Sequence, residues 1–190
     1  MFEEIIRAEI RAPSLSRGMK KRAYWLDSWG REMRHFIIAM ASAGYAGFFP
    51  WGPGTLGTLV GVLVYFLYSP LPPLIYLFTT SAFFFMACWI AGKAERILGE
   101  KDSPNIVIDE VTGYLVAMAW LPPSPACLAA GFLFFRVLDI IKPPPAGWIN
   151  TQMTGGLAVV LDDAVAGMYT NLLLRLIGYY FPNFFFLQGG

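Results

Sequence analysis

The chain has 190 residues, of which 56% are hydrophobic and 14% are charged, and its mean hydropathy is +0.53. Soluble domains carry about 25% charged residues, and residues 35–92 contain no Asp, Glu, Lys or Arg. Both features indicate a membrane protein rather than a soluble one. The net charge of +1 gives no support to a nucleic-acid partner. The two cysteines, Cys88 and Cys127, lie in apolar segments, which is typical of buried, unreactive thiols.

Residues 1–34 are predicted to form a basic cytoplasmic arm, distinct from a membrane-embedded domain at residues 35–190. The arm holds eight Lys or Arg residues against five acids. Cytoplasmic segments of membrane proteins carry an excess of Lys and Arg, so this bias places the N-terminus in the cytoplasm. A solvated tail and contact with anionic headgroups both agree with the charge.

The rest of the chain predicts an all-α fold, a multi-pass membrane bundle of about five apolar helices in hairpins. Residues 36–49 are apolar but shorter than the roughly 20 residues of a spanning helix, so a re-entrant or interfacial segment is expected there. In each hairpin a proline-rich turn joins the two helices, at residues 69–73 in the first and 121–125 in the second. The expected helices cover about residues 57–69, 74–91, 106–121, 126–142 and 157–180.

This topology predicts that the charged motifs meet on one side of the membrane. Residues 92–104 form the most polar segment after the N-terminus and are expected in the cytoplasm. Both proline turns then fall on the outer side. The charged motifs lie near the opposite ends of their helices, so they should converge at the cytoplasmic surface.

Two pairs of adjacent acids occur in otherwise apolar helices, Asp109-Glu110 and Asp162-Asp163. An ionised carboxylate in hydrocarbon costs several kcal/mol unless it is paired or bound to a metal. A divalent cation would balance the excess of negative charge, although acids at a helix N-terminus can also complement the helix dipole. Asp163, Gly167 and Asn171 share one helix face and are expected to face the interior.

A third motif places Arg136, Asp139 and Lys142 three residues apart on one helix face. Arg136 and Lys142 could hold phosphate oxygens, Arg136 through its planar fork. Asp139 would then bind the metal or orient Arg136. An intrahelical Arg136–Asp139 ion pair is the structural alternative.

The segment PWGPGTLGT at residues 50–58 is expected to be a flexible loop that runs into a helix N-terminus. Its backbone N–H groups and the hydroxyls of Thr55 and Thr58 could bind a phosphate. It lacks the Gly-Lys-Ser/Thr ending of a P-loop. The single histidine, His35, lies outside all motifs, and neither Cys-x5-Arg nor Asp-x-Asp occurs. With chemistry based on histidine, Cys-x5-Arg or Asp-x-Asp excluded, the remaining acidic residues favour metal-assisted chemistry.

Four ordered motifs resemble those of the phosphatidylglycerophosphatase A family. They are PGTLG at 53–57, IVIDE at 106–110, FRVLDIIKP at 135–143 and GGLAVVLDDAVAG at 155–167. The resemblance implies a Mg2+-dependent phosphatase of the bacterial inner membrane, with its active site facing the cytoplasm, that hydrolyses phosphatidylglycerol phosphate in phospholipid biosynthesis. It also implies a helical fold and a phospholipid substrate in the bilayer.

Motifs and resemblance together define the expected site. The catalytic residues are Asp109, Glu110, Arg136, Asp139, Lys142, Asp162 and Asp163, and the five acids among them are the Mg2+ ligands. The substrate-binding residues are Pro53, Gly54, Thr55, Gly57 and Thr58, with Arg136 and Lys142. Either a water or a carboxylate can serve as the nucleophile.

Two other functions are compatible with intramembrane acids. A CDP-alcohol phosphotransferase would need an Asp-Gly-x-x-Ala-Arg motif, which this chain lacks. An ion-coupled transporter would place its acids at the midplane of internal repeats, whereas these acids lie near one face. Oligomeric state is not predicted by the sequence.

Overall fold

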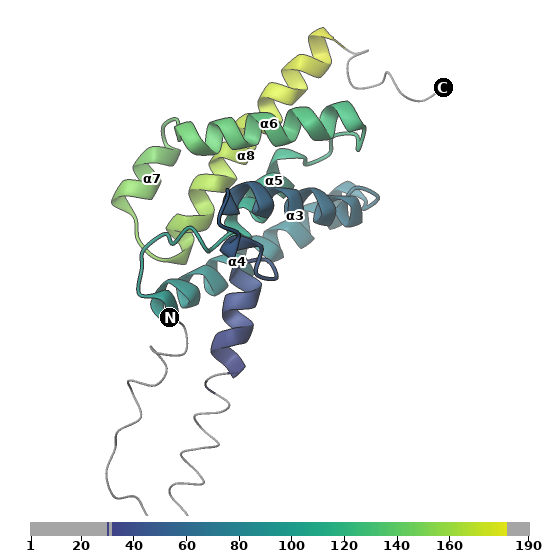
Figure 1. Ribbon diagram of the computed structural model, residues 1–190. Coiled ribbons are helices and arrows are strands. Elements are labelled where there is room, and N and C mark those ends of the chain that lie inside the picture. Colours follow the sequence, from purple (N-terminus) through teal and green to yellow (C-terminus); the bar gives the residue numbers. More distant parts are fainter. Residues whose placement is uncertain (1–29, 31, 182–190) are drawn as a thin grey trace, which may run out of the picture. The chain divides into compact units, whose positions relative to one another are not determined.

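The structure is a computed structural model that describes residue 30 and residues 32–181, and all regular elements within them are helices (Figure 1). The predicted all-α fold is therefore confirmed for this part of the chain. The chain divides into two units, residues 1–36 and 37–190. Of the first unit, residues 30 and 32–36 are described and helical. The predicted arm at residues 1–34 lies almost entirely outside the described residues.

After the helical residues 37–41, the described part of the second unit contains a short 3-10 helix, η1, and six α-helices. Pro53, Pro73 and Pro125 each occupy the first position of a helix, where the missing N–H has no helical partner to lose. Gly99, at φ 71°, ends one of the helices. The bounds are η1 (Ala46–Phe48), α3 (Pro53–Tyr68), α4 (Pro73–Leu98), α5 (Ile108–Ala117), α6 (Pro125–Ile141), α7 (Ala146–Gln152) and α8 (Gly156–Tyr180).

The five helices expected from the sequence have counterparts in α3, α4, α5, α6 and α8, but several bounds differ, and α5 ends at Ala117 and not near residue 121. The segment at residues 50–58 is not a loop beyond Gly52, because Pro53 starts α3 there. Helix α4 continues through the polar residues to Leu98, since its end is set by Gly99 and not by hydropathy. Residues 146–152, expected in a loop, form α7 directly after three prolines.

Helix α5 lies between α3 and α8 and packs closely against both (Figure 1). A side chain at Gly113 would lie 2.8 Å from the carbonyl oxygen of Asp163 and 2.6 Å from the ring of Phe135. Glycine at this position therefore allows α5 to approach the backbone of α8. This contact brings the first turn of α5 level with Asp163.

The predicted interior line of α8 is confirmed. Asp163 and Gly167 are buried, and Asn171 is half-buried. The Asn171 amide donates to the carbonyl oxygens of Ala117 and Ala119, at 2.8 and 3.0 Å. It thereby satisfies carbonyl groups at and just after the C-terminal end of α5. The last carbonyls of any helix have no partner within the helix.

Within the described residues, two helices are long and apolar enough to cross a membrane, α4 with 26 residues and α8 with 25. Large apolar side chains of α4, including Phe78 and Phe85, are exposed as on a lipid-facing helix. Helices α3 and α6 have 16 and 17 residues, about 24 and 26 Å at roughly 1.5 Å per residue, against a hydrocarbon core of about 30 Å. The protein is membrane-associated, but five spanning helices are not confirmed.

Candidate active site

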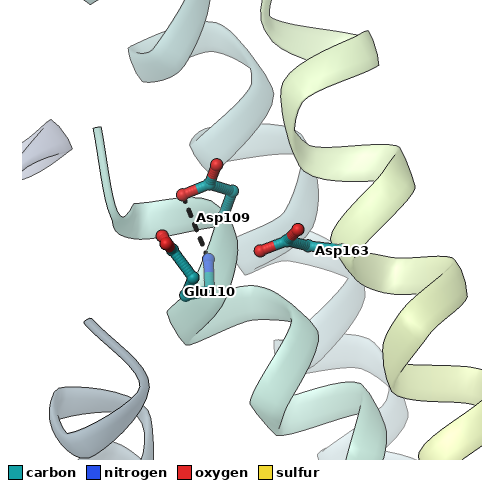
Figure 2. A group of neighbouring side chains, drawn as sticks. All are labelled: Asp109, Glu110 and Asp163. Carbon is teal, nitrogen blue, oxygen red and sulfur yellow. Dashed lines mark hydrogen bonds between the residues drawn. The ribbon is translucent and has the colours of Figure 1, made fainter. Parts of the chain in front are cut away.

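Three of the predicted acids come together between α5 and α8. Asp109 and Glu110 lie in the first turn of α5, and Asp163 projects toward them from α8 (Figure 2). One carboxylate oxygen from each lies within 4.8 Å of the other two. The Asp109 carboxylate also accepts a hydrogen bond from the Glu110 N–H at 3.1 Å. We call these three residues the acid trio.

The acid trio is buried and short of positive charge. Among the described residues, Oε2 of Glu110 and Oδ2 of Asp163 are buried without a hydrogen-bond partner. Burial raises the pKa of Asp109 well above its usual range, and the charge of Glu110 raises it further. Burial also raises the pKa of Glu110 to about 8, and the charges of Asp163 and Asp139 contribute to the increase. Ionised carboxylates in this arrangement require a cation.

The donor set of the acid trio fits a divalent metal ion. Mg2+ prefers carboxylate oxygens and usually binds one or two carboxylates together with substrate phosphate. The trio offers three such ligands and two oxygens that lack other partners. Asp139 adds its charge next to Asp163 and Glu110 but is not one of the three grouped ligands.

Arg136 approaches the acid trio from α6. Its Nη1 atom lies 2.5 Å from Oδ2 of Asp139 and 3.8 Å from Oε1 of Glu110. The side chain is mostly buried, with 17% of its surface exposed. Within the described residues both acids contact Nη1, so the other N–H groups of the guanidinium remain available to the oxygens of an anion. This contact is the intrahelical ion pair expected as the structural alternative, and it also places Asp139 to orient Arg136.

The first turn of α3 completes this corner of the site. A side chain at Gly54 would lie 2.9 and 3.0 Å from the two terminal nitrogens of Arg136 and would also meet Oε1 of Glu110. Thr55 is exposed in the same turn. Gly57 instead packs against Val107, and the buried Thr58 hydroxyl donates to the Gly54 carbonyl at 2.9 Å. Of the predicted substrate-binding motif, Gly54 lies against Arg136 and Glu110, and Pro53 and Thr55 belong to the same helical turn, while Gly57 and Thr58 secure the helix.

Replacing Gly54 by Ala is expected to damage the site itself. The added methyl group would displace Arg136 and Glu110, and overpacking of this kind costs about 1–3 kcal/mol. Gly57→Ala is the matched control, because its methyl group would press on Val107 and not on Arg136 or Glu110. We expect similar losses of thermal stability in both variants but a much larger loss of phosphatase activity in Gly54→Ala. Equal activities at equal stability would contradict the placement of Gly54.

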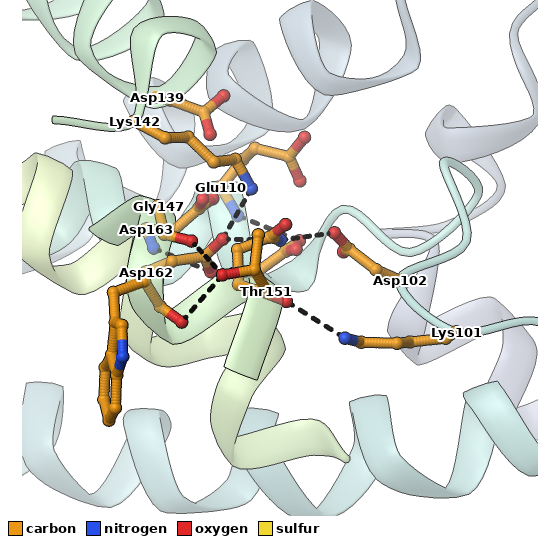
Figure 3. Close-up of polar contacts among 12 residues, drawn as sticks. Lys101, Asp102, Glu110, Asp139, Lys142, Gly147, Thr151, Asp162 and Asp163 are labelled. Atoms are coloured by element: carbon orange, nitrogen blue, oxygen red, sulfur yellow. Dashed lines mark hydrogen bonds and ion pairs between the residues drawn. The ribbon is translucent and has the colours of Figure 1, made fainter. Parts of the chain in front are cut away.

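A second polar network surrounds Asp162, which is not one of the three grouped acids (Figure 3). Lys142 Nζ lies 2.5 Å from Oδ2 of Asp162, and Asn150 Nδ2 donates to the same oxygen at 3.0 Å. The other oxygen, Oδ1, accepts from the Asp163 N–H at 3.1 Å. Both oxygens of Asp162 thus have partners. This arrangement favours Asp162 as the anchor of Lys142 over a role as metal ligand.

Asn150 and Asp102 belong to this network, although the sequence did not indicate a role for either. Asn150 on α7 also donates to Oδ2 of Asp102 at 2.7 Å, and Lys101 donates to the Asn150 carbonyl at 3.0 Å. The amide of Asn150 therefore links the segment before α5 to α8. Burial opposes the charge of Lys142, but Asp162, Asp102 and Asp163 outweigh it and raise the pKa of Lys142 to about 12. Lys142 is a fixed cation at the edge of the site.

A helical, membrane-associated protein with buried carboxylates beside an arginine has the arrangement expected of a phosphoryl-transfer enzyme. Comparison with known proteins agrees, since the family model of phosphatidylglycerophosphatase A matches residues 39–178. The chain belongs to the phosphatidylglycerophosphatase A family and is a phosphatase. The resemblance predicted from the four motifs is confirmed.

Three curated relatives cover most of the chain. Phosphatidylglycerophosphatase A of Escherichia coli is 31% identical over 72% of this chain and 80% of its own length. The Haemophilus influenzae protein of the same name is 32% identical over 67% of this chain and 80% of its own. A putative phosphatidylinositol-3-phosphatase of Bacteroides thetaiotaomicron is 33% identical over 74% and 93%. No solved structure matches the chain.

Proposed function

We propose that the protein is a Mg2+-dependent phosphatase that hydrolyses phosphatidylglycerol phosphate to phosphatidylglycerol and phosphate in phospholipid biosynthesis. The acid trio carries this proposal, because it groups three buried carboxylates beside the Arg136 guanidinium. Two relatives are named for this activity, and the third for a phosphatase that acts on another phospholipid. All three names share a phosphate monoester on a lipid headgroup.

Asp109, Glu110 and Asp163 would hold Mg2+, with Asp139 adjacent to them. When bound, the ion would polarise the phosphoryl oxygens and neutralise part of their charge. Three carboxylates and a phosphate monoester would carry more negative charge than one Mg2+ balances, and Arg136 and Lys142 would offset part of the remainder.

Arg136 and the N-terminus of α3 would bind the phosphoryl group. The free N–H groups of a helix N-terminus attract anions, and Gly54 places this helix end against the Arg136 nitrogens. Asp139 fixes the direction of the fork through Nη1. Asp162 and Asn150 hold Lys142 at the edge of the site, where its charge would stabilise negative charge that develops on the phosphoryl group.

We further propose an orientation in the bacterial inner membrane with α4 and α8 crossing the bilayer and the site at the cytoplasmic face. The C-terminal end of α4 meets the N-terminal end of α8, where Gly92 approaches Gly156. The acid trio lies at this same end, and so do the cations Lys93, Arg96 and Lys101 that follow along the chain. An excess of basic residues marks the cytoplasmic side.

Phosphate release from defined lipids tests the substrate. The purified protein is incubated in mixed micelles with Mg2+ and either phosphatidylglycerol phosphate, phosphatidylinositol 3-phosphate or glycerol phosphate. We expect the highest kcat/KM with phosphatidylglycerol phosphate. A clear preference for the inositol lipid would reassign the substrate, and no phosphate from any of the three would contradict the proposal.

A further inference from the structure

The segment at residues 45–51, which leads into α3, places large aromatic side chains on the surface. Tyr45, Phe49 and Trp51 have relative exposures of 52%, 49% and 84%. We call these three residues the aromatic rim. Exposed apolar side chains are unremarkable when scattered singly, but three exposed aromatic rings within one seven-residue segment favour an interaction surface.

The aromatic rim is held in place on its inner side. A side chain at Gly47 would lie 2.9 Å from the carbonyl carbon of Asn105, so the two backbones are in close contact. The Val107 N–H donates to the Ala41 carbonyl at 2.9 Å. Tyr45 has φ 71°, a conformation that a residue other than glycine keeps only where its surroundings impose it. The segment is therefore fastened to the residues that precede Asp109.

The aromatic rim is also continuous with the candidate phosphate site. Trp51 is followed by Gly52 and then by Pro53, which opens α3. Gly54 in that turn lies against Arg136 and Glu110. The depth of the aromatic rim in a membrane would therefore also set the depth of the first turn of α3.

A lipid headgroup layer is the partner that these residues fit. Trp and Tyr are enriched at membrane interfaces, where one end of the side chain is apolar and the other is hydrated. Trp89 on α4 is also exposed, with Lys93 Nζ 5.8 Å from its ring centroid, and Trp148 is exposed on α7. Residues 35–92 also have no Asp, Glu, Lys or Arg that would have to be desolvated in a membrane.

We propose that the aromatic rim inserts into the headgroup region of the bilayer and holds the first turn of α3 at the depth of the lipid phosphate. The effect on catalysis rests on the proposed lipid phosphatase activity, whereas the insertion does not. The rim would thereby favour phosphate monoesters carried on a membrane lipid over soluble ones.

Kinetics with two substrates test the effect on catalysis. Phe49→Ser/Trp51→Ser is compared with wild type in proteoliposomes on phosphatidylglycerol phosphate and on soluble p-nitrophenyl phosphate. We expect the apparent KM for the lipid to rise about tenfold, the scale of losing one buried aromatic side chain, with kcat on either substrate unchanged. Tyr180→Ser, which removes an exposed aromatic ring from the far end of α8, should change neither. Equal losses on both substrates, or no loss on the lipid, would overturn the proposal.

Fluorescence quenching tests the insertion without reference to activity. Wild type and Trp51→Phe are reconstituted with lipids brominated near the glycerol end of the acyl chain. We expect Trp51→Phe to lose a component of the emission that these lipids quench. If that component is quenched instead by aqueous iodide, the rim does not enter the bilayer. Absence of phosphate release by wild type, with lipid quenching intact, would count against the proposed function and leave the insertion standing.

Discussion

Asp163→Asn is expected to lower phosphatase activity by two or more orders of magnitude, on the scale of removing a preorganised electrostatic contact. The substitution keeps the shape of the side chain but removes one of three charges in the acid trio. Without divalent ions the variant should be more stable than wild type, because a buried carboxylate without a partner is lost. Wild type should gain thermal stability on addition of Mg2+, and the variant should gain much less.

Thermal unfolding with and without Mg2+, together with phosphate release, measures both effects. Glu100→Gln serves as the control, since it removes an exposed acid outside the trio. That variant should keep both its activity and its response to Mg2+. An Asp163→Asn protein with wild-type activity and an unchanged Mg2+ response would show that the acids have a structural role.

Arg136→Lys is expected to abolish most activity although it keeps the positive charge. Lysine has no planar fork, and one ammonium group cannot both contact Asp139 and bind a phosphate through two parallel hydrogen bonds. Removing the charge altogether, in Arg136→Met, should destabilise the fold by about 3 kcal/mol, because two mostly buried acids lose their partner.

A double-mutant cycle with Asp139→Asn separates catalysis from stability. If Arg136 only offsets buried charge, Arg136→Met/Asp139→Asn should recover both stability and activity relative to Arg136→Met. We expect partial recovery of stability, since Glu110 remains without a cation, and no recovery of activity. An active double mutant would remove Arg136 from the catalytic residues.

The convergence of the charged motifs could be predicted from the sequence. The proline turns and the polar segment fix on which side each apolar helix ends, and the charged residues lie near the ends opposite the proline turns. Two hairpins with their turns on one side should bring Asp109, Arg136 and Asp163 together at the opposite ends of their helices. The structure groups Asp109 with Asp163 and places Arg136 beside Glu110. The different roles of Asp162 and Asp163 could not be predicted. Adjacent helical residues point about 100° apart, and the contact of Gly113 with α8 decides which of them faces α5.

Residues outside the apolar helices were harder to recognise. Asp102 lies in a polar segment that is typical of a solvated loop. Asn150 follows three consecutive prolines, which predict a loop and not a helix. Their roles depend on the position of α7 next to Asp162, which no local pattern encodes. The start of α3 was misplaced because glycines suggest a loop, whereas Pro53 at the first helical position specifies a helix.

The dependence of phosphate release on Mg2+ tests the central claim most directly. The purified protein, freed of divalent ions with a chelator, is given phosphatidylglycerol phosphate in mixed micelles, and free phosphate is measured as Mg2+ is added back. We predict no release in the chelator, and a saturable recovery with Mg2+ that Asp163→Asn fails to show. Phosphate release in the chelator at the rate seen with saturating Mg2+ would contradict a metal site at the acid trio.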